Sequence, residues 1–498
     1  ITTGFGALVL ILFGRYFFIT FPIAIIVLIA PILLYWKVRN EAVSEEHQFH
    51  MGTETFKAAL DKRKKSKASR QASLKFSGND GLVTVPDKDD PQIEVYLAAE
   101  ELIGEALQSR ASRLELQLTA NGFQAAFLVD GIHTKKKPLF PDIVVKIAAF
   151  LKETAGADPT DVRRKQLVEF DVISDTGKVH VNLTASGSSK VHVIRLEFDR
   201  EQRVMRTWET IGLLPKQREL LNQLKQEKRR HGIVLIGGEQ QSGVTTTCYA
   251  ILSQHDSYLC NIVTIEREII AILEGITHNT CVKDESLYSS KLQTIIRRDP
   301  EIVLAADLRE AEAAKVAAKP GNDGPLIYVS MSASSTSELI SKWAGLVGDP
   351  RKSFGALRAV VFQKLVRKLC ENCRVPFKPG PDLAKQGLKF DSVEQLYRKG
   401  GQVELKNKVI TCPICDGSGY MGQIGVFETM FLDNDTQKHL IAGDLKAAMA
   451  HARRVKQLTR LQDAALQHVA TGETTLEEFG RVSSKKIKST QKTPAPTK

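Results

Sequence analysis

The residues with the clearest capacity for chemistry lie in the stretch "IVLIGGEQQSGVTTTCYAIL", residues 233–252. It reads as a buried strand, a glycine-rich turn and the start of a helix, which is the frame of the phosphate-binding loop G-x-x-x-x-G-K-[ST]. Because backbone N–H groups of such a loop cradle phosphate oxygens at a helix N-terminus, the spacing predicts a nucleotide site. The residues predicted to contact the nucleotide are Gly238, Ser242, Gly243, Val244, Thr245 and Thr246.

The position that a phosphate-binding loop gives to lysine is occupied here by Val244. That lysine would add a positive charge to the β- and γ-phosphates, which an apolar side chain cannot supply, whereas Thr245 keeps the hydroxyl that ligates Mg²⁺. Glu239 places a negative charge beside the loop, which further disfavours phosphate. The sequence therefore predicts weak binding of ATP and Mg²⁺ at most, and a chance glycine pair in an unrelated domain is the alternative.

Two further pairs of residues have the spacing of metal ligands. Cys370 and Cys373 stand in CENC, and Cys412 and Cys415 stand in CPIC. Four thiolates at this spacing favour tetrahedral Zn²⁺, and a site with no open ligand position is structural. A redox pair or buried free thiols are the alternative. The other three cysteines lie in or beside apolar runs and are expected in the core, so no disulfide framework is predicted.

The pattern of apolar residues predicts the elements that position these groups. After the glycine-rich turn, short apolar runs such as NIVTIE, EIVLAAD and PLIYVSM alternate with helical stretches, which predicts a doubly wound α/β domain over residues 200–365. Residues 91–199 predict a smaller α/β unit with an amphipathic helix, a strand that ends in an Asp-Gly turn, a second helix and a hairpin. The polar, basic residues 40–90 predict a linker.

An apolar segment near the start of the chain is long enough to cross a membrane. From Tyr16 to Trp36 there are 21 residues without a charge, and about 20 are needed to span a bilayer. Lys37, Arg39 and the basic linker place the residues that follow on the cytoplasmic side. A buried core helix is the alternative for this segment. Because the first residue is Ile rather than Met, the number of membrane helices stays open.

Length and charge bound the remaining possibilities. A chain of 498 residues predicts about three domains. The net charge is +12, but much of it lies in the linker and in a basic tail at residues 483–498. Attraction to anionic lipid and a simple solvated linker are both open for the basic run. No aromatic residues interleave with these basic runs, so a nucleic-acid partner is not expected.

Several motifs stand together in the order of one protein family. The chain resembles the hexameric ATPases of type II secretion and type IV pilus assembly from about residue 91 to residue 482. The resemblance implies an α/β fold, with a RecA-like P-loop domain after the family's second N-terminal domain, and then a zinc subdomain and a helical C-terminal region. The N-terminus departs from it, because those ATPases are usually soluble. The matching segments are "GGEQQSGVTTTCYAIL" (Walker A), "IVTIERE" (Asp box), "RRDPEIVLAADLREAEAAKVA" (Walker B), "CPICDGSGYMGQIGVFE" (zinc motif) and "LTRLQDAALQHVATGETTLEEF" (C-terminal region).

The resemblance also assigns catalytic positions, several of which carry unusual residues here. Asp307 stands where Walker B has Glu, so its carboxylate would lie about 1.5 Å further from a water that it should polarise. In the Asp box Glu266 matches, but Arg267 replaces an Asp and Ile270 replaces a Glu. Arg309 matches the arginine after Walker B. The predicted catalytic residues are therefore Asp307, Glu266 and Arg309.

Other positions of the family's pattern differ as well. Ser332 stands where the family has its His-box histidine, while Arg297 and Arg298 match the pattern. Phosphoryl transfer depends on positioning and charge stabilisation, so the loss of several donors together predicts a large loss of rate. In the second N-terminal domain, the family's arginines that reach a neighbour's nucleotide are replaced by Ala126, Leu128, Glu169 and Asn182.

These observations predict a membrane-tethered, catalytically impaired subunit or regulator of a secretion or pilus-assembly motor; a working ATPase of that motor is the alternative. The resemblance implies a homo- or hetero-hexamer with motor subunits and inner-membrane platform proteins, at the bacterial inner membrane with its main domains cytoplasmic. The predicted cofactors are structural Zn²⁺ and weakly bound ATP with Mg²⁺. The predicted division of the chain is transmembrane segment 1–39, linker 40–90, second N-terminal domain 91–199, P-loop domain 200–365, zinc subdomain 366–430, helical region 431–482 and tail 483–498.

Overall fold

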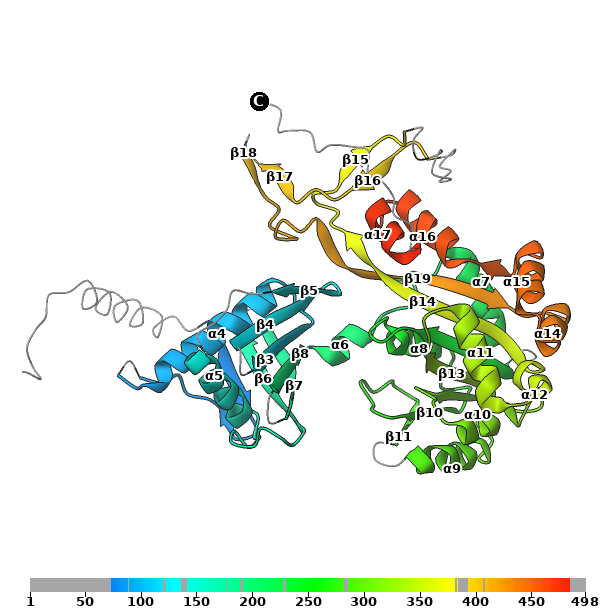
Figure 1. Ribbon diagram of the computed structural model, residues 1–498, viewed down its shortest axis with the longest axis horizontal. Helices are drawn as coiled ribbons and strands as arrows, with labels where there is room; N and C mark the ends of the chain where they lie inside the picture. Colours follow the sequence, from blue (N-terminus) through cyan, green and yellow to red (C-terminus); the bar gives the residue numbers. More distant parts are fainter. Residues whose placement is uncertain are drawn as a thin grey trace, which may run out of the picture. The chain divides into compact units, whose positions relative to one another are not determined.

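A computed structural model gives the fold of most of the chain (Figure 1). The structure describes residues 73–483 except for residues 88, 120–121, 136–140, 176, 189–190, 227–229, 282–284, 381–382, 384–392 and 406–407. The predicted membrane segment, residues 40–72 of the predicted linker and residues 484–498 of the predicted tail lie outside the described residues. The prediction of a linker is wrong for its last part, which forms two strands of the first domain. Among the helices that are described, none is both long enough and apolar enough to cross a bilayer.

The first described domain is built on an antiparallel sheet. Its strands are β1 (Lys75–Gly78), β2 (Gly81–Leu82), β3 (Arg113–Thr119), β4 (Gly122–Val129), β5 (Ile132–Lys135), β6 (Gln166–Ser174), β7 (Gly177–Gly187) and β8 (Val191–Phe198). They lie in the order β2-β1-β6-β7-β8-β3-β4-β5. The predicted Asp-Gly turn joins β4 to β5, and Asp130 and Gly131 take φ values of +48° and +78° there. The predicted hairpin is confirmed as β7 and β8.

Two helices complete this domain, as the amphipathic patterns predict: α4 (Gln92–Gln108) and α5 (Pro141–Thr154). Buried residues in α5 recur at helical spacing, with Ile147 and Leu151 fully buried. The ring of Phe150 in α5 meets the ring of Phe76 in β1 edge to face, with centroids 5.4 Å apart. One face of the sheet is therefore covered by α5, and the core forms between them.

The second domain is built on an eight-stranded mixed sheet with the order β11-β10-β12-β13-β9-β14-β19-β20. The strands from β11 to β14 are parallel, while β19 and β20 are antiparallel additions at one edge. The predicted α/β alternation is confirmed. The strands are β9 (Gly232–Gly238), β10 (Ile262–Glu266), β11 (Thr277–Thr280), β12 (Ile302–Ala305), β13 (Leu326–Ser332), β14 (Leu357–Leu369), β19 (Tyr420–Phe431) and β20 (Leu458–Thr459).

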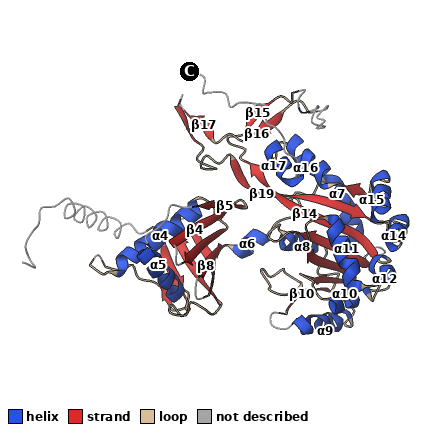
Figure 2. Ribbon diagram, in the orientation of Figure 1, coloured by secondary structure: helices blue, strands red, loops and turns tan. Residues whose placement is uncertain are grey.

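Helices cover both faces of this sheet (Figure 2). In β9, Ile233 and Leu235 join one core cluster with α9, α10 and α11, while Val234 and Ile236 join the other with α7 and α8. This alternation follows from the two-residue period of a strand, and it explains why β9 is apolar throughout. The helices are α6 (Arg200–Val204), α7 (Pro215–Asn222), η2 (Gln223–Lys225), α8 (Val244–Leu252), α9 (Glu285–Ile296), α10 (Ala311–Ala318), α11 (Thr336–Val347) and α12 (Pro350–Phe354).

The remaining elements form two short hairpins and a group of helices. The hairpins pair β15 (Val375–Phe377) with β16 (Leu396–Arg398), and β17 (Gln402–Leu405) with β18 (Lys408–Thr411). The helices are α14 (Asn434–Ile441), α15 (Leu445–Arg454), α16 (Leu461–Ala470) and α17 (Leu476–Ser483). Strands β14 and β19 run through the predicted boundaries at 365/366 and 430/431. The predicted zinc subdomain is therefore continuous with two strands of the main sheet.

Candidate functional site

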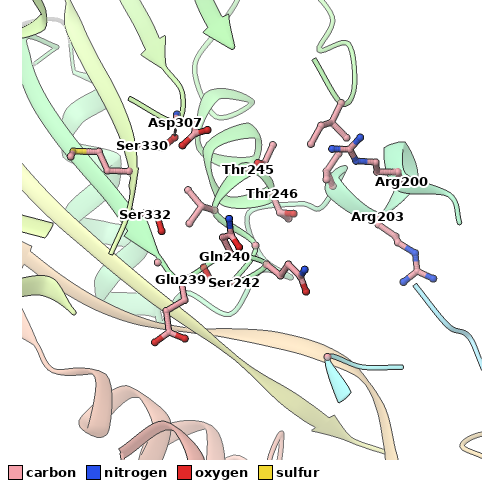
Figure 3. A pocket seen from close by; sticks show the side chains of 18 of the residues that line it. Arg200, Arg203, Glu239, Gln240, Ser242, Thr245, Thr246, Asp307, Ser330 and Ser332 are labelled. Atoms are coloured by element: carbon pink, nitrogen blue, oxygen red, sulfur yellow. Dashed lines mark hydrogen bonds between the residues drawn. The ribbon is translucent and has the colours of Figure 1, made fainter. Parts of the chain in front are cut away.

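The glycine-rich loop joins the end of β9 to the first residue of α8 (Figure 3). A Cβ atom at Gly238 would stand 2.2 Å from the Ser242 hydroxyl oxygen and 3.0 Å from the Gln363 carbonyl oxygen, so a larger residue requires a shift. Gly243 is the N-cap of α8 and has a φ of +82°, a left-handed conformation that glycine adopts at little cost. Both glycines are therefore needed for the path of the loop.

Hydrogen bonds hold this loop in one conformation. The Ser242 N–H donates to the Glu239 carbonyl at 3.1 Å, and the Ala333 N–H donates to the Gly238 carbonyl at 3.0 Å. From β14, Gln363 Nε2 donates to the Ser242 carbonyl at 2.6 Å. The buried Ser242 hydroxyl has no hydrogen-bond partner within the described part of the chain. A buried hydroxyl without a partner is costly, so an anion at the N-terminus of α8 is a chemically suitable occupant.

Val244, which stands in place of the lysine, packs against the protein core. It is partly buried and packs against a cluster that includes Ile236 and Tyr249. Its side chain therefore contributes to packing and offers no charge to a phosphate. Beside the loop, the Glu239 carboxylate lies 3.3 Å from the Lys364 ammonium of β14. This ion pair partly offsets the negative charge that the sequence places there.

Asp307 follows β12, and two arginine side chains contact its carboxylate. One oxygen accepts from Arg309 Nε at 3.0 Å, and the other accepts from Arg309 Nη2. Arg267 Nε lies 3.4 Å from that second oxygen. The backbone of Asp307 is left-handed, with a φ of +50°, and its N–H donates to the Ser330 hydroxyl at 2.8 Å. The carboxylate that Walker B uses to polarise water is thus neutralised by its neighbours.

The Arg267 side chain also reaches beyond Asp307. Its Nη2 donates to Glu310, its Nε lies 3.2 Å from the Asp307 carbonyl, and its guanidinium lies 5.4 Å from the centre of the Tyr288 ring. Burial by itself lowers the pKa of Arg267, but the hydrogen bond to Glu310 and the charges of both carboxylates raise the pKa above its ordinary value. A fixed positive charge therefore stands where the family's pattern has an aspartate.

Glu266 is buried at the end of β10, where both of its oxygens accept hydrogen bonds. One oxygen accepts from the Tyr249 hydroxyl at 2.6 Å, and the other accepts from the Thr264 hydroxyl at 2.7 Å and lies 2.9 Å from His278 Nδ1. The Leu273 N–H donates to His278 Nε2 at 3.0 Å, so the proton of that imidazole is on Nδ1 and faces Glu266. Burial and the bond to Glu266 raise the pKa of Tyr249. This geometry favours a structural task for Glu266.

The other predicted positions are spread over both domains. Ser332 ends β13 beside the loop, and its carbonyl accepts from Lys342 Nζ of α11 at 3.0 Å. Arg297 and Arg298 are exposed after α9. In the first domain Glu169 and Asn182 face each other across β6 and β7, and the structure pairs Ala126 with Lys135 and Leu128 with His133. Thr245 and Thr246 lie on the first turn of α8, as Figure 3 shows.

A cavity of about 180 Å³ beside α8 is the place where P-loop proteins hold Mg²⁺. Its lining includes Thr245, Glu266, Arg267 and Asp307. Mg²⁺ requires oxygen ligands in near-octahedral geometry, yet all four oxygens of Glu266 and Asp307 already accept hydrogen bonds. The Arg267 guanidinium adds repulsion, since unit charges 4 Å apart interact by about 4 kcal/mol at an effective dielectric constant of 20. These residues therefore do not fit a divalent cation.

The four cysteines of the two C-x-x-C motifs come together as one buried cluster. The sulfurs of Cys370 and Cys412 are 3.9 Å apart, those of Cys373 and Cys415 are 3.6 Å apart, and all four lie within 4.8 Å of one another. A tetrahedral ion with bonds of about 2.3 Å requires sulfurs about 3.8 Å apart. The cluster therefore fits Zn²⁺, which would have a closed and structural coordination there.

Backbone and amide donors surround these sulfurs. The Gly401 N–H lies 3.2 Å from Cys373 Sγ, and the Gly419 N–H lies 3.3 Å from Cys415 Sγ. Asn372 Nδ2 lies 3.3 Å from Cys412 Sγ. Donors of this kind stabilise metal-bound thiolates and fix their orientation, so the cluster has hydrogen-bond donors suited to orient zinc-bound sulfurs.

The fold is the mixed α/β fold of secretion ATPases, and comparisons with known proteins agree. Residues 87–481 match the family described as "Type II/IV secretion system protein", so the chain belongs to this family. Type II secretion system protein E of Dickeya dadantii is 28% identical over 80% of this chain and 78% of its own length. The type IV pilus assembly ATPase PilB of Thermus thermophilus is 25% identical over 76% of this chain and 42% of its own length.

A solved structure shares the fold. The Legionella pneumophila ATPase DotB superposes with a TM-score of 0.53, at 13% identity, over 80% of this chain and 98% of its own length. At that identity the likeness concerns the fold alone. The mixed α/β ATPase fold expected from the sequence is therefore confirmed for the described domains.

Sequence reasoning missed several groups that the structure brings to the loop. Gln363 and Lys364 reach it from β14, which the register places directly beside β9. Lys342 of α11 donates to the Ser332 carbonyl at the end of β13, beside the loop. No spacing rule links these residues to the glycines, because the contacts depend on strand order. At Arg267 the sequence shows only the loss of a carboxylate, whereas the ion pairs of Arg267 with Asp307 and Glu310 depend on the fold.

Proposed function

We propose that this chain is a membrane-tethered, catalytically impaired member of its family, acting as a subunit or regulator of a type II secretion or type IV pilus-assembly motor. One observation carries the proposal: the site keeps the backbone of a phosphate-binding loop, but its catalytic side chains are engaged elsewhere. Val244 packs into the core, and Asp307 is bonded to Arg309. The family supplies the setting, since its members named above belong to secretion and pilus-assembly systems.

The residues present divide binding from chemistry. The N-terminus of α8 and the unpartnered Ser242 hydroxyl are suited to hold phosphate oxygens, together with loop N–H groups other than that of Ser242, which donates to the Glu239 carbonyl. A side chain that stabilises the charge of the γ-phosphate and a carboxylate free to polarise water are also needed for turnover. Val244 and the arginine-bound Asp307 provide neither, so slow turnover follows even where a nucleotide is bound.

A working motor remains the second candidate, and one observation favours it. Lys364 lies beside the loop in an ion pair with Glu239 whose two side chains are partly exposed. A phosphate that displaced Glu239 would gain this ammonium in place of the absent lysine. The working motor also requires the ion pair between Asp307 and Arg309 to break, and we favour the impaired subunit because it needs no such change.

The catalytic part of the proposal is tested by steady-state phosphate release from the full chain in detergent. We expect turnover well below the rate of about one per second that marks the slow end of ordinary enzymes. The matched comparison is the same preparation without ATP, which gives the background phosphate. Turnover at about one per second or faster, abolished by a Gly238→Val substitution that blocks the loop, would establish the working motor instead.

Location and assembly belong to the proposal as well. Tyr16–Trp36 supports a membrane tether, and Lys37 and Arg39 after it support a cytoplasmic position for the main domains, at the bacterial inner membrane. A homo- or hetero-hexamer with inner-membrane platform proteins is the assembly that the family resemblance favours. A reporter enzyme that is active only in the cytoplasm should be active when it is fused near residue 90. Activity only of a reporter that requires the periplasm would refute this topology.

A further inference from the structure

The position of Arg267 is fixed by the central sheet. Strands β10 and β12 are parallel neighbours, with Ile265 beside Ala305. The residues that follow these strands, Arg267 and Asp307, therefore leave the same edge of the sheet together. At that edge Arg267 Nε lies 3.4 Å from the Asp307 carboxylate, and Arg267 is one-fifth exposed. The contact is a consequence of strand order and does not depend on a mobile surface side chain.

Two carboxylates and two guanidinium groups lie together at this edge. Asp307 accepts from Nε and Nη2 of Arg309 and lies near Arg267 Nε, while Glu310 accepts from Arg267 Nη2. The formal charges of these four residues sum to zero. A divalent cation would have to share a carboxylate oxygen with a guanidinium or break one of these ion pairs, and it would then stand beside two positive charges.

The remaining ligands beside α8 are too few to hold the ion. Thr245 contributes a hydroxyl to the cavity, but Glu266 is committed to Tyr249, Thr264 and His278. With a nucleotide bound, Mg²⁺ would find only this hydroxyl, phosphate oxygens and waters, and no uncommitted carboxylate to hold the ion on the protein. By contrast, the anion-binding features of the loop, which are its N–H groups, the end of α8 and the Ser242 hydroxyl, do not depend on a metal.

We propose that this site binds nucleotide without a divalent cation, with Arg267 holding the charge at the Walker B edge that Mg²⁺ would otherwise balance. The inference rests on the proposed function, because it concerns the same loop and the same weak nucleotide binding. The ligand class is a free nucleoside diphosphate or triphosphate. Chelation of Mg²⁺ leaves the affinity of the site for this nucleotide unchanged, in contrast to a P-loop that recognises the metal–nucleotide complex.

The experiment is calorimetric titration of the full chain in detergent with ADP, once in excess Mg²⁺ and once in EDTA. We expect the two dissociation constants to agree within about two-fold. ADP binding that is about ten-fold tighter with Mg²⁺ would overturn the inference and leave the proposed function standing. Absence of ADP binding in both conditions would overturn the inference together with the proposed nucleotide loop, so the two failures are distinguishable.

A charge exchange at Arg267 tests the cause. Arg267→Asp removes the guanidinium and adds a carboxylate beside Asp307 and Glu310, so Mg²⁺ should then tighten ADP binding by about five-fold or more. The matched control is Arg460→Ala, which removes an exposed arginine paired with Asp463 on α16 and should keep the wild-type insensitivity to Mg²⁺. The wild-type comparison needs no variant, so it decides the proposal even where Arg267→Asp folds poorly. Mg²⁺-dependent binding in wild type and in Arg460→Ala alike would contradict it.

Discussion

The glycine-rich loop and the cysteine cluster both have a recognisable spacing in the sequence. They differ in whether their predicted side chains are free for the predicted task in the structure. In the cysteine cluster, every ligand predicted from the sequence has its sulfur near the others. Two of the sulfurs accept from backbone N–H groups, and a third accepts from the Asn372 side-chain amide. At the nucleotide site, the loop backbone follows the expected path. However, Val244 packs into the core, and Asp307, which follows β12, is held in ion pairs.

The difference lies in what each site requires of the fold. A structural zinc site contributes directly to folding, so loss of one ligand costs stability. A catalytic lysine or glutamate contributes to rate, and its replacement by a residue that packs well leaves the fold intact. The loop glycines belong with the cysteines in this respect, because their lack of a side chain shapes the chain path. We therefore expect substitution of a cysteine ligand to lower stability, and substitution of a catalytic side chain to change the rate and leave the fold intact.

The largest expected effect is at the cysteine cluster. Cys412→Ser removes one of four thiolates, and structural zinc sites contribute about 10 kcal/mol or more of binding free energy in small domains. We expect elemental analysis of the purified full chain to fall from about one zinc per chain to well under half. Limited proteolysis should then cut within residues 366–430 before it cuts elsewhere.

The matched control for that substitution is Cys260→Ser. Cys260 is also buried, but it contacts Arg230 rather than another thiol. Zinc content should stay at about one per chain in this variant. A wild-type chain, freshly prepared and reduced, that carries well under one zinc would contradict the assignment of the cluster.

A moderate effect is expected from filling the loop glycine. In Gly238→Ala the new methyl group meets the Ser242 hydroxyl oxygen at 2.2 Å and the Gln363 carbonyl oxygen at 3.0 Å. Overpacking of this kind costs about 1–3 kcal/mol, so the melting temperature should fall. Gly345→Ala is the matched control, because nothing lies within 4 Å of its added methyl group and a helical alanine stabilises by about 0.5–1 kcal/mol. Equal melting temperatures for the two variants would remove the steric argument.

The smallest change in turnover is expected from restoring the lysine. Val244→Lys returns a positive charge to the loop, and a charge-assisted hydrogen bond to phosphate should tighten ADP binding by about 1–3 kcal/mol. Turnover should stay low, because Asp307 remains bonded to Arg309 and Ser332 still stands in place of the histidine, and catalytic groups act as one unit. Calorimetry and phosphate release measure the two effects separately.

The control for the lysine is Val455→Lys, which places the same side chain at an exposed position after α15. It should alter neither ADP binding nor turnover. A Val244→Lys variant that hydrolyses ATP at about one per second or faster would mean that the lysine alone had been missing.

Local patterns predicted much of the fold and part of the site. The helix α5, the hairpin β7–β8 and the strand β9 with its glycine-rich turn follow from periodicity and turn residues within a few positions of one another. The cysteine cluster was also predictable, because a pair of ligands separated by two residues fixes half of a tetrahedron. In each case the information lies in adjacent residues.

The rest depends on strand order, which these patterns do not encode. Arg267 meets Asp307 because β10 lies beside β12, and Gln363 meets Ser242 because β14 lies beside β9. The burial of Glu266 likewise depends on His278, which β11 brings alongside β10. The sequence therefore predicted which carboxylates remain, and the structure was needed to find that they are already occupied.

The most direct test measures both sites in one preparation of the full chain, with zinc by elemental analysis and ATP turnover by phosphate release. The account predicts about one zinc per chain together with turnover far below one per second, the low end of ordinary enzyme rates. A sample with zinc in place and turnover of about one per second or faster would contradict it, because the nucleotide site would then be as complete as the cysteine cluster.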